Sequence, residues 1–122
     1  GHPTQITTLA DMAMRAMARE DGEVALTMAA KAAEVADAIY AEPEPLSMFA
    51  HLVHADALIL NAHYAEADEV LDAVAPQVAA LPPEMKNLRG MLAKSRATLC
   101  SRRPGAAAGD CPGNGSAQAP QE

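Results

Sequence analysis

Aromatic residues are almost missing from this chain, which has no Trp, two Tyr and one Phe among 122 residues although 50% of them are hydrophobic. Alanine and seven Met are prominent in their place. Small alanines let helices approach one another closely, and flexible Met side chains fill the irregular gaps that rings would otherwise occupy. The composition and length favour one helical domain with a modest core.

Cysteine is also scarce. Cys100 and Cys111 are too few for a disulfide framework, and Cys111 lies in a stretch without periodic pattern, so we expect free thiols in a reducing compartment. No apolar run approaches membrane-spanning length, and no charged-then-apolar signal segment opens the chain. These absences predict a soluble, cytoplasmic protein with no membrane partner.

Positive charge is missing from the middle of the chain. The net charge is -7, and no Lys or Arg occurs between Lys31 and Lys86. An acidic surface repels phosphate backbones, which disfavours a nucleic-acid role for the body of the domain, and we expect no nucleic-acid partner. Either this is a solvated face or it selects a basic or amphipathic partner. Basic residues return after the acidic stretch, at Lys86, Arg89, Lys94, Arg96, Arg102 and Arg103.

Motifs for catalysis are absent as well. The sequence contains no glycine-rich phosphate loop, no nucleophile elbow and no pair of carboxylates with an evident cleft. His51 and His54 are three residues apart and could approach one metal ion from a helix, but the sequence offers no third ligand. We therefore predict neither an enzyme nor a resident metal or cofactor.

Two alanine-dense segments, Leu9 to Tyr40 and Phe49 to Leu81, dominate the pattern, and each breaks once at a short turn, at residues 20–22 and 61–63. Apolar residues recur at helical spacing on both sides of each turn. This predicts an all-α fold of two tandem antiparallel helical hairpins stacked on each other, followed by a fifth helix. Pro76 should kink or end the fourth helix.

The expected boundaries follow from turn and composition signals. Residues 1–4 are expected to be a tag remnant and a disordered lead, residues 5–101 a helical-repeat domain, and residues 102–122 a flexible tail. Pro43 and Pro45 separate the hairpins, because proline removes a backbone donor and disfavours the helical conformation of its predecessor. The first helix is expected to start near Gln5 and the third near Leu46.

The second hairpin resembles the tetratricopeptide repeat. Ala55, Tyr64, Ala67, Leu71 and Pro82 stand in or near that family's small, aromatic, alanine, bulky and closing proline positions. The chain departs from the family in its period, because Ala25 and Ala67 are 42 residues apart, whereas the family repeats after about 34. The resemblance implies a superhelix capped by the fifth helix. A plain antiparallel bundle is the alternative.

The resemblance also implies a function. Such domains hold a peptide or helix of a partner protein, here in a groove lined by the first and third helices, with Met14, His51, His54 and Asp56 as candidate contacts. The acidic middle of the chain would select a partner with Lys or Arg at its rim. A secretion chaperone and the sensor region of a bacterial regulator are the two suggested settings, and self-association is a further option.

A histidine phosphotransfer domain is the alternative function, since such phosphorelay proteins are acidic helical bundles that expose one histidine. His51, His54 and His63 are the candidates. The lysine-glycine pair that follows the histidine in that family is missing after all three. Acidic Asp56 would also oppose a phosphoryl group on its neighbour His54.

Overall fold

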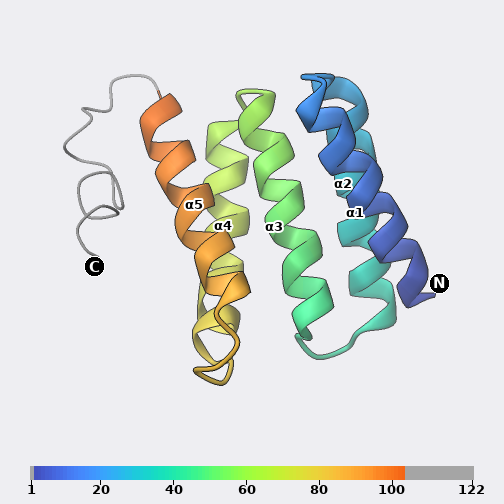
Figure 1. Ribbon diagram of the computed structural model, residues 1–122, viewed down its shortest axis with the longest axis vertical. Helices are drawn as coiled ribbons and strands as arrows, with labels where there is room; N and C mark the ends of the chain where they lie inside the picture. Colours follow the sequence, from blue (N-terminus) through green and yellow to red (C-terminus); the bar gives the residue numbers. More distant parts are fainter. Residues whose placement is uncertain (1, 104–122) are drawn as a thin grey trace.

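The computed structural model describes residues 2–103, which form five α-helices and no strand (Figure 1). The predicted all-α fold with five helices is therefore confirmed, while the expected tail lies outside the described residues from position 104 onward. The helices are α1 (Pro3–Ala18), α2 (Gly22–Ile39), α3 (Pro45–Leu60), α4 (Tyr64–Ala79) and α5 (Asn87–Arg102).

The helices lie in two layers. Each helix packs antiparallel to the next one along the chain, and in addition α1 contacts α3 and α3 contacts α5. In residues 2–103, α2 and α4 do not contact each other. One layer is therefore α1–α3–α5 and the other is α2 and α4 (Figure 1). The helix α3 is central, because it touches all four others.

The helices of the two hairpins recur at a fixed spacing along the sequence. Helices begin at residues 3 and 45, at 22 and 64, and again at 45 and 87, so each element recurs after 42 residues. The turns repeat in the same way, since Glu20 and Ala62 both have a positive φ, of 59° and 62°. The spacing between Ala25 and Ala67 thus extends to the whole hairpin.

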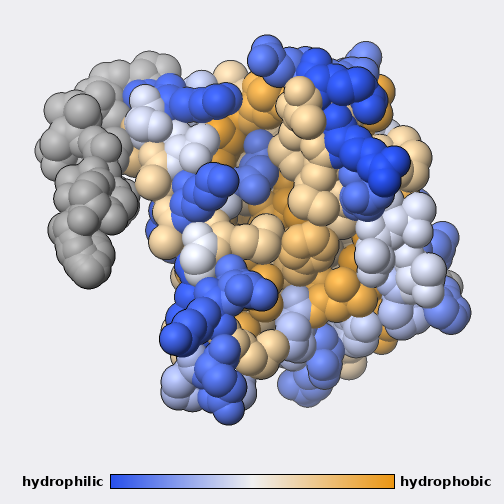
Figure 2. Space-filling model, in the orientation of Figure 1, coloured by the Kyte–Doolittle hydropathy of each residue, from blue (hydrophilic) through white to orange (hydrophobic). Residues whose placement is uncertain are grey.

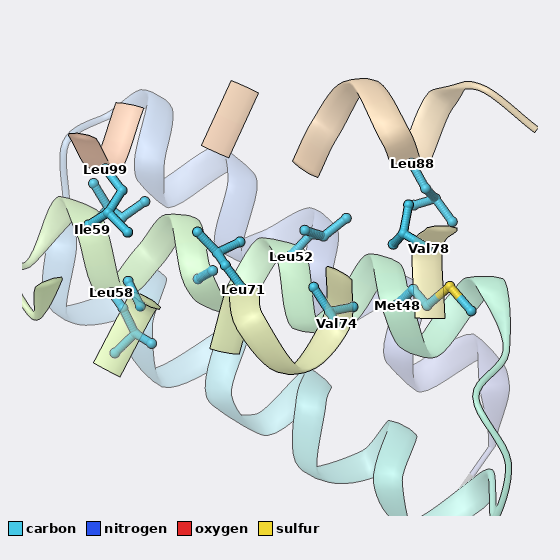
Figure 3. Packing of buried hydrophobic residues seen from close by; sticks show 11 residues of the cluster. Met48, Leu52, Leu58, Ile59, Leu71, Val74, Val78, Leu88 and Leu99 are labelled. Atoms are coloured by element: carbon cyan, nitrogen blue, oxygen red, sulfur yellow. The ribbon is translucent and has the colours of Figure 1, made fainter. Parts of the chain in front are cut away.

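The core is uneven along the stack. The first hairpin buries alanines, including Ala10, Ala13, Ala16, Ala25 and Ala29. Because burying a large aliphatic side chain contributes about 1.5–3 kcal/mol and alanine much less, most hydrophobic stabilisation comes from the second hairpin and α5. The large buried side chains there are Met48, Leu52, Leu58, Ile59, Leu71, Val74, Val78, Leu88 and Leu99 (Figure 3).

Charged side chains of α5 and of its C-cap residue Arg103 contact α4. Arg96 pairs with Asp72 at 3.1 Å and Arg103 with Asp68 at 3.5 Å. The Arg89 guanidinium donates to backbone carbonyls of the loop before α5, including those of Leu81 and Pro82. Part of the basic end of the chain therefore serves to dock α5 on the acidic second hairpin.

Two boundaries differ from those expected. The helix α1 begins at Pro3, two residues early, because His2 caps it: its Nδ1 accepts a hydrogen bond of 3.2 Å from the Thr4 amide. Proline is well tolerated in the first turn, where its missing N–H is not needed. In α4, Pro76 does not end the helix, which continues to Ala79 with Val74 and Val78 buried on either side.

Cys100, near the end of α5, is disulfide-bonded, so the expectation of a free thiol is wrong for this residue. Cys111 lies outside the described residues. Among residues 2–103, none of the helices has the length and apolar character needed to cross a membrane.

Candidate functional site

A groove lies on the face formed by α1, α3 and α5. It has a volume of about 350 Å³, and all three helices contribute apolar side chains to a lining that also contains polar and charged groups. Figure 2 shows this face, with apolar surface in its middle and hydrophilic side chains around it. The groove is lined by Met17 of α1, by Asp56, Ile59 and Leu60 of α3, and by Met91, Lys94, Ser95, Thr98 and Arg102 of α5.

Asp56 is the acidic group of this groove. Its side chain is half-buried, and the buried Ser95 hydroxyl donates a 2.6 Å hydrogen bond to its Oδ1. Ser95 is only 3% exposed. Within residues 2–103, no other group donates to this carboxylate. Among the described residues, the second oxygen of this carboxylate therefore has no hydrogen-bond donor.

The electrostatics of Asp56 reflect this position. Burial raises the pKa of the Asp56 carboxyl above its ordinary value of 3.8, while the Ser95 hydrogen bond and the charge of Lys94 act in the opposite direction. Burial penalises the charged form, so a cationic neighbour would stabilise it. The arrangement suits a carboxylate that receives a Lys or Arg side chain from a partner.

Met14 does not itself line this groove. It is 38% exposed on α1 and precedes Met17 by three residues, so the two side chains share one side of the helix. Exposed Met side chains offer an adaptable apolar surface. Of the four predicted contacts, Asp56 therefore lines the groove, and Met14 is exposed one helical turn from the groove residue Met17.

The other two predicted contacts lie elsewhere, which corrects the expectation that all four line one groove. His51 Nε2 is 2.9 Å from Asp37 Oδ1 on α2, and His51 also lines a separate hollow of about 280 Å³ with residues of α4, including Glu69. At 100° per residue, Asp56 is about 140° around α3 from His51. Because α3 packs on every side, its polar residues point to different faces.

His54 follows His51 by one helical turn on that opposite side. Its side chain is half-buried, and burial, together with the nearby charge of His51, lowers the pKa of His54 below 6.5, with Glu66 acting in the opposite direction. We name the surface formed by His51, His54, Asp37, Glu66 and Glu69 the histidine face.

The geometry lends no support to the phosphotransfer alternative. His63 Nδ1 lies 2.9 Å from Glu66 Oε1, and His51 lies against Asp37. Carboxylates beside these histidines would repel a phosphoryl group. Among residues 2–103, no three His, Cys, Asp or Glu side chains are grouped as metal ligands.

Ser95 is a member of the groove that the sequence pattern does not single out. It occurs in a helical stripe with Leu88, Met91, Leu92 and Leu99, and the stripe alone indicates only a packing face. A single hydroxyl within such a stripe is the signal that could have found it, because a buried hydroxyl needs a hydrogen-bond partner.

Comparison with known protein-family models, with curated proteins and with solved structures found no match for the chain. The resemblance to tetratricopeptide repeats therefore stays a prediction from the residues of the second hairpin.

Proposed function

We propose that this chain is a protein-interaction module that holds a helix or peptide of a partner protein in the groove between α1, α3 and α5. The observation that carries the proposal is the half-buried Asp56 carboxylate, which has one donor among residues 2–103, the Ser95 hydroxyl, and shares the groove with the apolar side chains of Met17, Ile59, Leu60 and Met91. A carboxylate with only a structural role would have a lower free energy if it were fully solvated than in this half-buried position. Burial makes the charged form of Asp56 costly even with the Ser95 hydrogen bond and the Lys94 charge nearby, and proteins keep such groups where binding needs them.

The groove defines the chemistry of the partner. Met17, Ile59, Leu60 and Met91 would accept apolar side chains, and Asp56 would accept one Lys or Arg through a charge-assisted hydrogen bond. An amphipathic helix with a basic residue one turn from its apolar anchors satisfies both requirements.

Two cations at the groove limit the charge that the partner can carry. Lys94 and Arg102 lie at the α5 side of the groove, so a strongly basic segment would be repelled there. The partner would therefore carry one cation toward Asp56 and neutral or acidic residues toward α5.

The proposal includes a tetratricopeptide-like arrangement and a cytoplasmic setting, and the setting now rests on sequence features other than free thiols because Cys100 is disulfide-bonded. The two layers and the 42-residue recurrence of helix starts support a repeat architecture. A chaperone that guards an aggregation-prone client and the sensor region of a bacterial regulator remain the two settings. A chaperone role predicts that the chain suppresses light scattering by its client at equimolar concentration, whereas a sensor role does not.

A displayed library of random amphipathic peptides tests the proposal even though the natural partner is not identified. Selection on the intact chain should enrich peptides with apolar residues at helical spacing and one Lys or Arg. The same selection on Asp56→Asn should lose the enrichment of the basic residue. Glu69→Gln, which removes one negative charge from the histidine face, is the matched control and should retain it. No enrichment on the intact chain would refute the proposal.

A further inference from the structure

A second apolar surface lies on the side of the first hairpin that faces away from α3. Between α1 and α2, a shallow hollow of about 630 Å³ is lined by Leu9, Thr27, Met28, Ala30, Lys31 and Glu34. In residues 2–103, α1 and α2 pack only on each other and on α3, so no helix covers this side. We name this surface the first-hairpin edge.

Exposed apolar residues extend the first-hairpin edge. Val24 is 36% exposed and lies in line with Met28 and Lys31 at helical spacing on α2. Met12 is 43% exposed and follows Leu9 by three residues on α1. Contiguous apolar surface is uncommon on a soluble protein and marks a site of interaction. An apolar outer face therefore calls for a covering partner.

The charges on this edge identify the partner. Lys31 Nζ is 3.2 Å from Glu34 Oε1, and both side chains are exposed beside the apolar centre. One cation and one anion next to an apolar patch are self-complementary under a twofold axis. With two α2 helices antiparallel and the axis between positions 31 and 34, Lys31 of each copy would face Glu34 of the other.

We propose that the first-hairpin edge joins two copies of this chain in a symmetric dimer. A chain with net charge -7 repels its own copy over most of its surface. Lys31 is the last cation before a stretch that is acidic up to Lys86, so the first-hairpin edge is a place where charge is balanced. The dimer leaves the groove between α1, α3 and α5 open on both copies.

The area of the first-hairpin edge sets the expected affinity of the dimer. With 18 residues, α2 is about 27 Å long, and a face two helices wide offers on the order of 500 Å² per copy. Stable interfaces bury about 800 Å² per partner. We therefore expect a weak dimer whose population rises with protein concentration.

Sedimentation velocity of the intact chain, from the micromolar to the millimolar range, tests this proposal. We expect a monomer–dimer equilibrium that Lys31→Glu and Glu34→Lys each weaken by at least about tenfold, because each places like charges opposite each other across the twofold axis. An equimolar mixture of the two variants should restore dimers, since every facing pair is then opposite in charge. Lys86→Glu, in the loop before α5, makes the same charge change as Lys31→Glu and should leave the equilibrium unchanged.

Three results would overturn it. The first is a chain that remains a monomer at all concentrations. The second is a pair of variants that associate like the unmodified chain, or that form no dimer when mixed. The third is a mass that continues to rise beyond that of a dimer. The last result would indicate head-to-tail stacking of the first-hairpin edge on the α4–α5 side of another copy. Circular dichroism of each variant confirms that the fold is retained. Peptide selection on Lys31→Glu should give the same result as on the unmodified chain, because residue 31 does not line the groove. A failure of dimerisation can therefore be told apart from a failure of peptide binding.

Discussion

Asn61, at the end of α3, donates a side-chain hydrogen bond of 2.9 Å to the carbonyl of Gly22 at the start of α2. The same amide donates to the Ala57 carbonyl at 2.8 Å. A Cβ on residue 22 would lie 2.9 Å from Asn61 Oδ1, closer than such atoms approach. The contact between the two hairpins at this end therefore depends on the absence of a side chain at position 22.

This relationship predicts a non-additive pair of substitutions. Gly22→Ala alone should lower the free energy of unfolding, because Asn61 must move, and Asn61→Ala alone should lower it by about 1–2 kcal/mol through the lost hydrogen bonds. In the Asn61→Ala background, Gly22→Ala should be neutral or stabilising, since alanine favours the helix. Urea unfolding of the four proteins measures the coupling, and simple additivity would contradict the account.

The two turns predict a stabilising change. Glu20 and Ala62 are exposed and adopt a left-handed conformation, which costs a residue with a Cβ about 1–2 kcal/mol. Glycine relieves this strain but costs more backbone entropy, so Ala62→Gly should raise the free energy of unfolding by about 0.5–1 kcal/mol.

Ala65→Gly is the matched control for this prediction. Residue 65 is an exposed alanine in the first turn of α4, where glycine should lower stability. Thermal unfolding should show a higher melting temperature for Ala62→Gly and a lower one for Ala65→Gly, each compared with the unmodified chain. A lower melting temperature for Ala62→Gly would show that the left-handed turn conformation is not the source of strain.

The pKa of His54 predicts how stability depends on pH. Because the folded pKa lies below the ordinary 6.5, the unfolded chain takes up a proton first. Stability should therefore fall as pH decreases from about 6.5 toward the lower folded pKa. His54→Gln should remove this part of the pH dependence. The free energy of unfolding of both proteins is measured across this pH range. The same pH dependence in the two proteins would contradict the cause given for the pKa shift, namely burial beside His51.

Some of the fold follows directly from the sequence, and some does not. Helices, turns and the 42-residue spacing of Ala25 and Ala67 could be predicted, because apolar periodicity and turn residues are local signals. The size difference between Ala29 and Leu71, both fully buried at equivalent positions, also identifies where the core is strongest.

The site was less predictable. Asp56 lines the groove and Met14 is exposed one helical turn from the groove residue Met17, yet His51 and His54 lie on the histidine face. Helical spacing gives the angle between residues of one helix but not which neighbour each angle meets. For α3, which is apolar on nearly all sides, that information comes only from packing with α2, α4 and α5. Similarly, Ser95 becomes significant only once α5 lies against α3.

Asp56→Asn tests the central claim most directly, through the affinity of a peptide selected on the intact chain measured together with the free energy of unfolding. Since burial raises the Asp56 pKa, its charge opposes folding once the pH has risen through the folded pKa, and the neutral amide can still accept the Ser95 hydrogen bond. We predict that Asp56→Asn weakens peptide binding by at least about tenfold while stability at neutral pH is equal or higher. Unchanged affinity, or a loss of stability that accounts for the weaker binding, would contradict a partner-binding role for this carboxylate.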